Sequence, residues 1–455
     1  MENVCWPYFD PEYESLSQRI HPPMVRIDND TYQDCSLVMV DSANRHGILL
    51  EVVQVLTDLD LIISKAYISS DGGWFMDVFH VTDQLGNKLT DQRIIDYIQQ
   101  ALGAKRDAST TEVRTCLGRT VGVQSIGEHT VIELTGTDRP GLLSEISAVL
   151  TNLKSNVVAA EVWTHKMRVA CVVYITDELT AKPIEDPERL NSIKEQLSNV
   201  LKGNDDRKGV KTDFSMGLTH TERRLHQMMF ADRDYEGPET RSLGEDGRPI
   251  ITIENCNEKG YSVVTVHSKD RPKLLFDTVC TLTDMQYVVF HASINSTESC
   301  AVQEYYIRHM DGCTLDTEGE KQRVIKCLEA AIERRVSDGI RLELCTRDRV
   351  GLLSDITRIF RENGLSVTRA DVTTRGDRAV NVFYVTDASG NPVDMKIVEA
   401  IRKEIGHTYL QVKNAPSSPR SCPIDNATEK PRFSFGSLLK SQIERFSYNI
   451  GLIRS

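Results

Sequence analysis

Hydrophobic positions along the chain switch repeatedly between the spacing of strands and the spacing of helices. Within residues 340–414, a β-rich apolar run at 340–345 precedes apolar residues at helical spacing, namely Leu352, Leu353, Ile356, Ile359 and Phe360. Strand-like runs then occupy 365–373 and 379–386, a second amphipathic helix is predicted over 393–405, and a short strand over 409–412. The predicted order of elements is βαββαβ.

Four segments of the chain share one loop and keep one register after it. The loops read NRHGIL (44–49), DRPGLL (138–143), DRPKLL (270–275) and DRVGLL (348–353). An alanine follows the fourth loop residue by 19 positions in every copy, and the next strand-like run ends 36 positions after that residue; the alanines are Ala66, Ala160, Ala292 and Ala370. This constant register indicates four copies of one structural unit.

A βαββαβ unit predicts an α+β, ferredoxin-like fold, in which an antiparallel sheet carries both helices on one face. The third copy departs from this pattern, because Lys273 replaces the loop glycine and no segment remains for its last strand. The only candidate, Ile340–Cys345, is needed as the first strand of the fourth copy. Residues 249–254 can supply the missing strand through a hairpin with 261–266, so the third copy is predicted to be permuted.

The repeat predicts the organisation of the whole chain. We expect an N-terminal segment at 1–33, repeat domains at 34–125 and 126–217, a polar linker with a helix at 218–248, repeat domains at 249–338 and 339–414, and a basic tail at 415–455. In the tail, apolar residues fall near one helical face. Docking on the protein's own domains or disorder is the favoured reading of the tail, and peripheral contact with a membrane is the alternative.

Composition and charge exclude several classes of function. The 455 residues carry a net charge of −12, which disfavours nucleic-acid binding, and no run of about 18 apolar residues exists to span a bilayer. The chain starts MENVCWPYFDPEYESL, which lacks the features of a secretory signal, and its 11 cysteines are scattered without a CxxC pair. We expect a reduced chain in the cytoplasm or the nucleus, without a metal site or a cofactor.

The repeated loop is the candidate binding site. Backbone N–H groups at the start of a helix attract carboxylates, and glycine lets a small ligand approach them closely. Gly47, Gly141 and Gly351 stand at this place, while Asn44, Asp138 and Asp348 can pair with an ammonium group. A purely structural role is the equal alternative: the glycine relaxes a turn and the acidic side chain caps the helix.

The strand, the DRPGLL loop and the helix within a βαββαβ unit resemble the ACT domain, a regulatory module of amino-acid metabolism. Four copies in this order, with the linker sequence HTERRLHQMMFADRDYE and the ending RFSYNIGLIRS, resemble the plant ACT-domain-repeat proteins over nearly the whole chain. In that family at large, ACT units pair side by side and amino acids bind between them against the loop glycine. The resemblance implies ligand binding at Asn44, Gly47, Asp138, Gly141, Asp348 and Gly351, whereas Lys273 puts the third site in doubt.

These observations favour a non-enzymatic sensor of free amino acids that reports to an unknown protein partner. The alternative is a protein–protein interaction scaffold whose ligand pockets are vestigial. Intrinsic catalysis is not expected, because the four copies use up the chain and no catalytic motif is present. No copy has the aromatic strand of an RNA-recognition domain. Homodimerisation is expected from the open sheet edges of four units.

Overall fold

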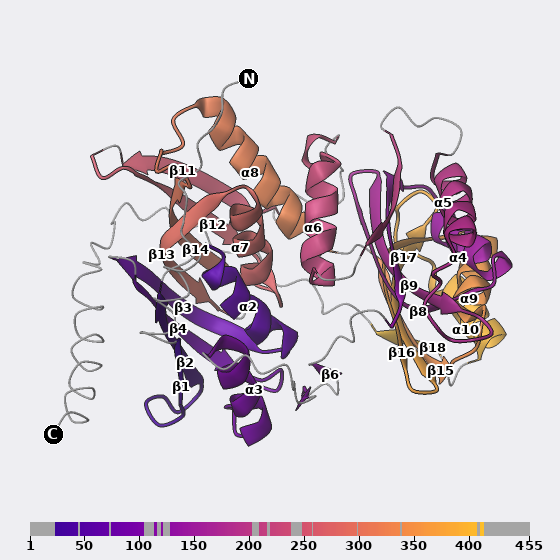
Figure 1. Cartoon of the computed structure of the whole chain (residues 1–455), viewed down its shortest axis with the longest axis horizontal. Helices are drawn as coiled ribbons and strands as arrows, with labels where there is room; N and C mark the ends of the chain where they lie inside the picture. The colour runs from indigo at the N-terminus through magenta and orange to yellow at the C-terminus, as the bar shows by residue number, and fades with distance from the viewer. Residues whose placement is uncertain are drawn as a thin grey trace. The chain divides into compact units, whose positions relative to one another are not determined.

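The computed structural model describes residues 23–43, 46–71, 74–103, 113–115, 120–121, 128–202, 209–215, 219–237, 248–256, 258–297, 299–336, 339–406 and 410–413. In these ranges the strands form two eight-stranded sheets and a two-stranded ribbon, and every strand pair is antiparallel. Figure 1 shows the helices of the repeats lying along these sheets. The predicted α+β class with ferredoxin-like repeat units is confirmed.

One sheet combines the second and fourth copies. Its strands run in the order β10-β7-β9-β8-β16-β17-β15-β18. The second copy contributes β7 (Thr130–Thr137), α4 (Leu142–Asn152), β8 (Ser155–His165), β9 (Arg168–Asp177), α5 (Pro187–Lys202) and β10 (Lys211–Ser215). The fourth copy contributes β15 (Ile340–Arg347), α9 (Leu352–Glu362), β16 (Leu365–Arg375), β17 (Arg378–Asp387), α10 (Met395–Ile405) and β18 (Leu410–Lys413). Both follow the predicted βαββαβ order.

The other sheet combines the first and third copies, in the order β1-β2-β4-β3-β13-β14-β12-β11. The first copy contributes β1 (Met24–Asp28), β2 (Ser36–Ala43), α2 (Ile48–Asp58), β3 (Ile62–Asp71), β4 (Trp74–Thr82) and α3 (Gln92–Leu102). The third contributes β11 (Ile250–Cys256), β12 (Tyr261–Ser268), α7 (Leu274–Asp284), β13 (Tyr287–Ser296), β14 (Ala301–His309) and α8 (Glu318–Glu333).

Both copies in this sheet are permuted. The predicted hairpin of the third copy is confirmed, since β11 pairs with β12 from Ile250 opposite His267 to Cys256 opposite Tyr261. The βαββαβ order predicted for the first copy is wrong: its edge strand is β1, which precedes β2 and lies within the segment assigned to 1–33. An upstream strand can take this place because the last strand of a βαββαβ unit is also antiparallel to the first. Residues 113–114 and 120–121 form the separate ribbon, β5 and β6.

The repeated alanine marks the junction between paired copies. Ala66 and Ala292 lie in the β3–β13 pairing, and Ala160 and Ala370 lie in the β8–β16 pairing. Each junction is covered by one continuous hydrophobic core drawn from both copies. Copies therefore pair alternately, first with third and second with fourth, and not with their neighbours along the chain.

The predicted linker helix is α6 (Thr221–Ala231), followed by a short 3-10 turn at Asp234–Glu236. Its apolar side packs on the sheet of the second and fourth copies, where Leu225 and Met229 contact Trp163 of β8. This is the sheet face opposite α4 and α9, because Trp163 alternates with Val162, which belongs to the core under those helices. On the linker helix, Nε2 of His226 lies 2.8 Å from Oδ1 of Asp277 of α7. The linker thus contacts two copies that belong to different sheets.

The cysteines differ in burial. Cys35, Cys171 and Cys280 are buried thiols, whereas Cys345 is exposed because its strand turns that position to solvent. Cys300 is disulfide-bonded, so the expectation of a fully reduced chain is wrong at this residue.

In the part of the chain described here, no helix combines the length and apolar character that crossing a membrane requires. The tail at 415–455 lies outside the described residues.

Candidate functional site

The repeated loop ends in a left-handed residue that starts the helix in every copy. Gly47, Gly141 and Gly351 have φ of +82°, +81° and +78° as the N-caps of α2, α4 and α9, and glycine has no side chain with which to cap a helix. The N-cap position is therefore held by the glycine and not, as the structural alternative had it, by Asp138 or Asp348. The left-handed turn carries the chain into the helix without a side-chain acceptor, which leaves first-turn N–H groups available.

Asp138 and Asp348 instead begin loops that are tied to neighbouring hairpins. The N–H of Asp138 donates to the carbonyl of Met167 at 2.8 Å, and the N–H of Asp348 donates to the carbonyl of Asp377 at 2.8 Å. These two contacts are equivalent, since each carbonyl belongs to the turn between the second and third strands of its copy. The loops of the second and fourth copies consequently have the same shape.

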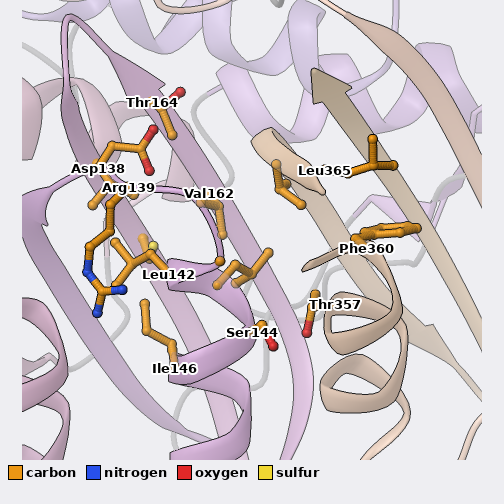
Figure 2. Close-up of a pocket in the computed structure, with 15 residues that line it drawn as sticks. Asp138, Arg139, Leu142, Ser144, Ile146, Val162, Thr164, Thr357, Phe360 and Leu365 are labelled. Carbon is orange, nitrogen blue, oxygen red and sulfur yellow. The ribbon is translucent and has the colours of Figure 1, made fainter. Parts of the chain in front are cut away.

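A cavity lies beside the loop of the second copy and is closed by the fourth copy. Asp138, Gly141, Ser144 and Val162 line one side, and the other side is formed by Thr357, Phe360, Leu365 and Val367. Figure 2 shows Ser144 of α4 and Thr357 of α9 opposite each other at this boundary, with Phe360 and Leu365 on the far wall. The site is thus shared by two copies that are distant in sequence.

A second cavity repeats the arrangement with the roles exchanged. Here Asp348, Gly351 and Ser354 come from the fourth copy, while Ser147, Thr151, Asn156 and Val157 come from the second. In each cavity the space open to the centres of water molecules is about 20 Å³, roughly enough for one water. Both also open toward solvent, so a ligand larger than water would have to spread the walls.

The two glycines press against the opposite copy. A Cβ at Gly141 would lie 2.7 Å from Cδ of Arg361 on α9, and a Cβ at Gly351 would lie 3.5 Å from Cγ2 of Thr151 on α4. A side chain at either position would therefore enter the space between the copies.

Charge at the two cavities differs. Burial raises the pKa of Asp138 to about 6, against the lowering effects of the Arg139 N–H and of its guanidinium. The Arg139 side chain turns away from the cavity to Glu145, with Nη1 2.8 Å from Oε1. Asp348 receives a hydrogen bond of 3.3 Å from Oγ1 of Thr374. The first cavity offers a carboxyl group that changes protonation near neutral pH, and the second an acceptor on a polar wall.

The loop of the third copy is filled by its own side chains. Lys273 adopts the same left-handed conformation with φ of +67°, and its Nζ lies 2.5 Å from Oε1 of Glu222 on α6. Where the second copy has Ile146, Cys171 and Val173, the third has a buried polar cluster of Thr278, Gln303 and Tyr305. Oγ1 of Thr278 lies 2.9 Å from Oε1 of Gln303 and 2.7 Å from the hydroxyl of Tyr305. These side chains fill the place of a third site, which agrees with the doubt that Lys273 raised about it.

The structure therefore brings four of the six predicted site residues together in two reciprocal cavities: Asp138, Gly141, Asp348 and Gly351. Gly47 lies in the other sheet, with no atom within 4 Å of an added Cβ. Asn44 lies outside the described residues. Ligand binding by these residues stays a prediction. The cavity walls from the opposite copy were not predicted, because no pattern within one copy indicates which other copy it contacts. The repeated alanine at the junction was the one available signal.

Comparison with known proteins agrees with the repeat. A model of the ACR family N-terminal ACT domain matches residues 31–109, and a model of the ACT domain matches 130–200 and 340–403. The ACT domain-containing protein ACR3 of Arabidopsis thaliana is 62% identical over 452 residues, which cover 97% of this chain and 99% of that protein. The ACT domain-containing protein ACR4 of the same plant is 58% identical over 98% of both chains.

One bacterial enzyme matches a short segment of this chain. A bifunctional uridylyltransferase/uridylyl-removing enzyme of Bradyrhizobium diazoefficiens is 40% identical over 84 residues, which are 18% of this chain and 9% of that enzyme. The full-length similarity to the plant proteins, together with the four repeat units in two paired sheets, shows that this chain belongs to the ACR family of ACT-domain-repeat proteins.

Proposed function

We propose that this chain is a non-enzymatic regulatory protein that binds small amino acids in the two cavities between its second and fourth copies. The observation that carries the proposal is their reciprocal construction. Each cavity joins a helix start marked by a left-handed glycine and an acidic loop residue to a wall from the opposite copy.

The chemistry of the loops matches a zwitterion. First-turn N–H groups at Gly141 or Gly351 suit a carboxylate, and Asp138 or Asp348 suits an ammonium group. Burial raises the pKa of Asp138 to about 6, so at pH 7 most of this carboxyl is ionised and able to pair with a cation. The apolar walls from Phe360 and Leu365 suit a small side chain.

The position of the cavities supplies a regulatory mechanism. A ligand that spreads the walls would change the packing of α4 against α9, and α6 packs on the other face of the same sheet. The ligand can shift this arrangement only as far as its affinity differs between two states. A protein partner that reads the linker or the tail, in the cytoplasm or the nucleus, completes the proposal.

A thermal-shift screen of the intact chain against the twenty amino acids tests binding, because a ligand of the native state raises its stability. We expect a small set of amino acids to raise the melting temperature. Gly141→Asp and Gly351→Asp should each weaken that response, and Gly390→Asp is the matched control. Gly390 has the same left-handed backbone, with φ of +83° and open space around it. No response to any amino acid would favour the scaffold alternative, in which the cavities are vestigial.

Homodimerisation is a separate part of the proposal. The outermost strands are β1 and β11 in one sheet and β10 and β18 in the other, and each leaves one row of backbone groups available for pairing. Light scattering after size-exclusion chromatography should give twice the chain mass of 51.3 kDa. A mass that stays at that of one chain across concentrations would reject the dimer and leave the cavities unaffected.

A further inference from the structure

The first copy contains a buried acidic residue that no side chain in the described part of the chain compensates. Asp77 lies on β4 with 0% of its surface exposed, and neither carboxyl oxygen has a hydrogen-bond partner among the residues that the structure describes. Burial raises the pKa of Asp77 well above its ordinary value; the nearby N–H of Ser69 acts in the opposite direction without forming a hydrogen bond that satisfies either oxygen. Because buried polar groups are almost always paired, an unpaired carboxyl requires an explanation.

The register of the sheet places Asp77 at the floor of a loop site. Asp77 lies opposite Val40 and Ile68, as Cys171 lies opposite Leu134 and Val162. In the fourth copy the same position is Asn381, opposite Leu344 and Val372.

Cys171 and Asn381 both line the cavities described above. Asn381 also accepts a hydrogen bond of 3.3 Å from the N–H of Thr373, which occupies the position of Ser69. Asp77 is therefore the equivalent of two cavity-lining residues and belongs to the site of the Gly47 loop.

The described residues around Asp77 supply apolar walls but no cation. Val279 and Leu282 of α7 stand where Thr357 and Phe360 stand on α9, and both are fully buried in the shared core of the first and third copies. At the same position the third copy has Gln303, whose side chain is satisfied by Thr278 and Tyr305. At this position the third copy has Gln303 with two partners, the second and fourth copies have Cys171 and Asn381, and only the first copy of the four has an acid.

We propose that Asp77 is the counter-charge for an organic ammonium group that binds beneath the Gly47 turn, at the junction of the first and third copies. The inference extends the proposed function to a second kind of site, and it does not depend on the cavities beside Gly141 and Gly351. The ligand class is a primary amine: the side chain of a basic amino acid, a simple diamine, or the α-ammonium of a neutral amino acid.

Binding through this acid has a proton balance that can be measured. Burial favours the protonated form of Asp77, whereas an ammonium ligand favours the ionised form. One proton then leaves Asp77 for solvent as one ligand enters, while the ligand keeps its own charge.

Isothermal titration calorimetry of the full chain at pH 7, in two buffers that differ in ionisation enthalpy, tests the proposal. L-lysine, putrescine and L-leucine are the probes, because they separate a side-chain ammonium, an ammonium without a carboxylate, and an α-ammonium alone. We expect at least one probe to bind with release of close to one proton per chain. Asp77→Asn should abolish the proton release and weaken binding tenfold or more.

The variants separate this site from the others. The double variant Gly141→Asp/Gly351→Asp should lose the two sites between the second and fourth copies and keep the proton-releasing event. The two proposals can therefore fail independently of each other. Gly47→Ala should weaken the event, and Gly86→Ala is its control, with the same left-handed φ and open surroundings in the same copy.

Infrared spectroscopy of the unaltered chain gives an independent reading, since the carbonyl band of one protonated carboxyl should disappear on addition of the binding probe. Absence of binding by all three probes, or equal binding and equal proton release in Asp77→Asn, would overturn the proposal.

Discussion

In the sheet that joins the second and fourth copies, both loops carry glycine and both face a cavity closed by the other copy. In the sheet that joins the first and third copies, one loop has Gly47 and the other has Lys273, whose ammonium is bound by Glu222. The same repeat therefore builds a reciprocal pair in one sheet and an unequal pair in the other. Because copies pair alternately along the chain, one pair can keep two equivalent loop cavities while the loops of the other pair diverge.

The divergence of the third copy has a structural use. Asp277 of α7 is fully buried and lies 2.7 Å from Nη2 of Arg335, 2.8 Å from Nη2 of Arg271 and 2.8 Å from Nε2 of His226. Burial alone would raise the pKa of Asp277, but Arg335, Arg271 and His226 hold it below its usual range. The guanidinium of Arg335 also stacks on Trp163 of β8 at 4.8 Å. The third copy thus fixes the linker helix and reaches the other sheet through a buried ionic cluster.

The largest expected effect comes from breaking that cluster. Asp277→Ala leaves buried cations without their counter-charge and should lower the free energy of unfolding by about 3–5 kcal/mol. The control is Glu362→Ala, which removes an exposed i,i+4 pair with Arg358 and should cost about 0.5 kcal/mol or less. Urea unfolding of both variants measures the difference. Equal losses would mean that the buried cluster is not what distinguishes the third copy.

The next effect is the contribution of Asp77 in the first copy to the pH dependence of stability. The pKa of Asp77 is raised in the folded state, so the native chain keeps a proton that the unfolded chain releases above about pH 4. Without ligand, stability should therefore fall as pH rises from about 4 toward the folded pKa, by about 1.4 kcal/mol per pH unit. Asp77→Asn should remove this contribution and leave that of other carboxyls with raised pKa, such as Asp138. Unfolding free energies of both proteins at pH 5, 6 and 7 provide the check, and parallel curves would contradict an uncompensated acid.

A third effect separates backbone strain from loss of the cavity. Gly141→Ala and Gly390→Ala both force a side chain into a left-handed conformation, which costs about 1–2 kcal/mol. Only the first also meets Arg361 across the copy junction, so only Gly141→Ala should weaken amino-acid binding as well. Thermal unfolding with and without the binding amino acid compares them. An equal loss of ligand response in Gly390→Ala would show that the effect is unspecific.

The smallest effect concerns the filled interior of the third copy. Tyr305→Phe removes a buried hydroxyl that bonds to Thr278 and Gln303 and should cost about 1 kcal/mol. The amino-acid response of the other copies should not change. If Tyr305→Phe altered that response, the third copy would be part of the ligand machinery and the contrast between the two sheets would need revision.

Much of the fold could be predicted because the repeat states it locally. Loop, helix and strand positions recur in constant register. Even the hairpin of the third copy could be predicted, because that copy lacks a last strand once Ile340–Cys345 is assigned to the fourth copy, and 249–254 is a spare strand. The edge strand of the first copy was missed because Met24–Asp28 is short and lies ahead of the repeated register. The pairing of copies was also missed, since it depends on contacts across the chain that no single copy encodes.

The candidate site was predicted in part for the same reason. Gly141 and Gly351 could be found because a left-handed turn requires glycine and repeats at one loop position. Asp77 could not be found, since an acid within an alternating strand is expected to face solvent, whereas the fold buries it opposite Val40 and Ile68. Lys273 was recognised as a departure, but its partner Glu222 lies in the linker and only the folded chain brings them together.

The number of binding events measured by calorimetry on the intact chain tests whether amino acids bind at the junction of the second and fourth copies. For a neutral amino acid selected by the thermal-shift screen, and apart from any proton-releasing event at Asp77, we expect two binding events per chain in the unaltered protein. It predicts one event in Gly141→Asp, one in Gly351→Asp and none in the double variant, while Gly390→Asp retains two. Undiminished binding in the double variant, with the fold intact by circular dichroism, would contradict the assignment of the ligand to the junction of the second and fourth copies.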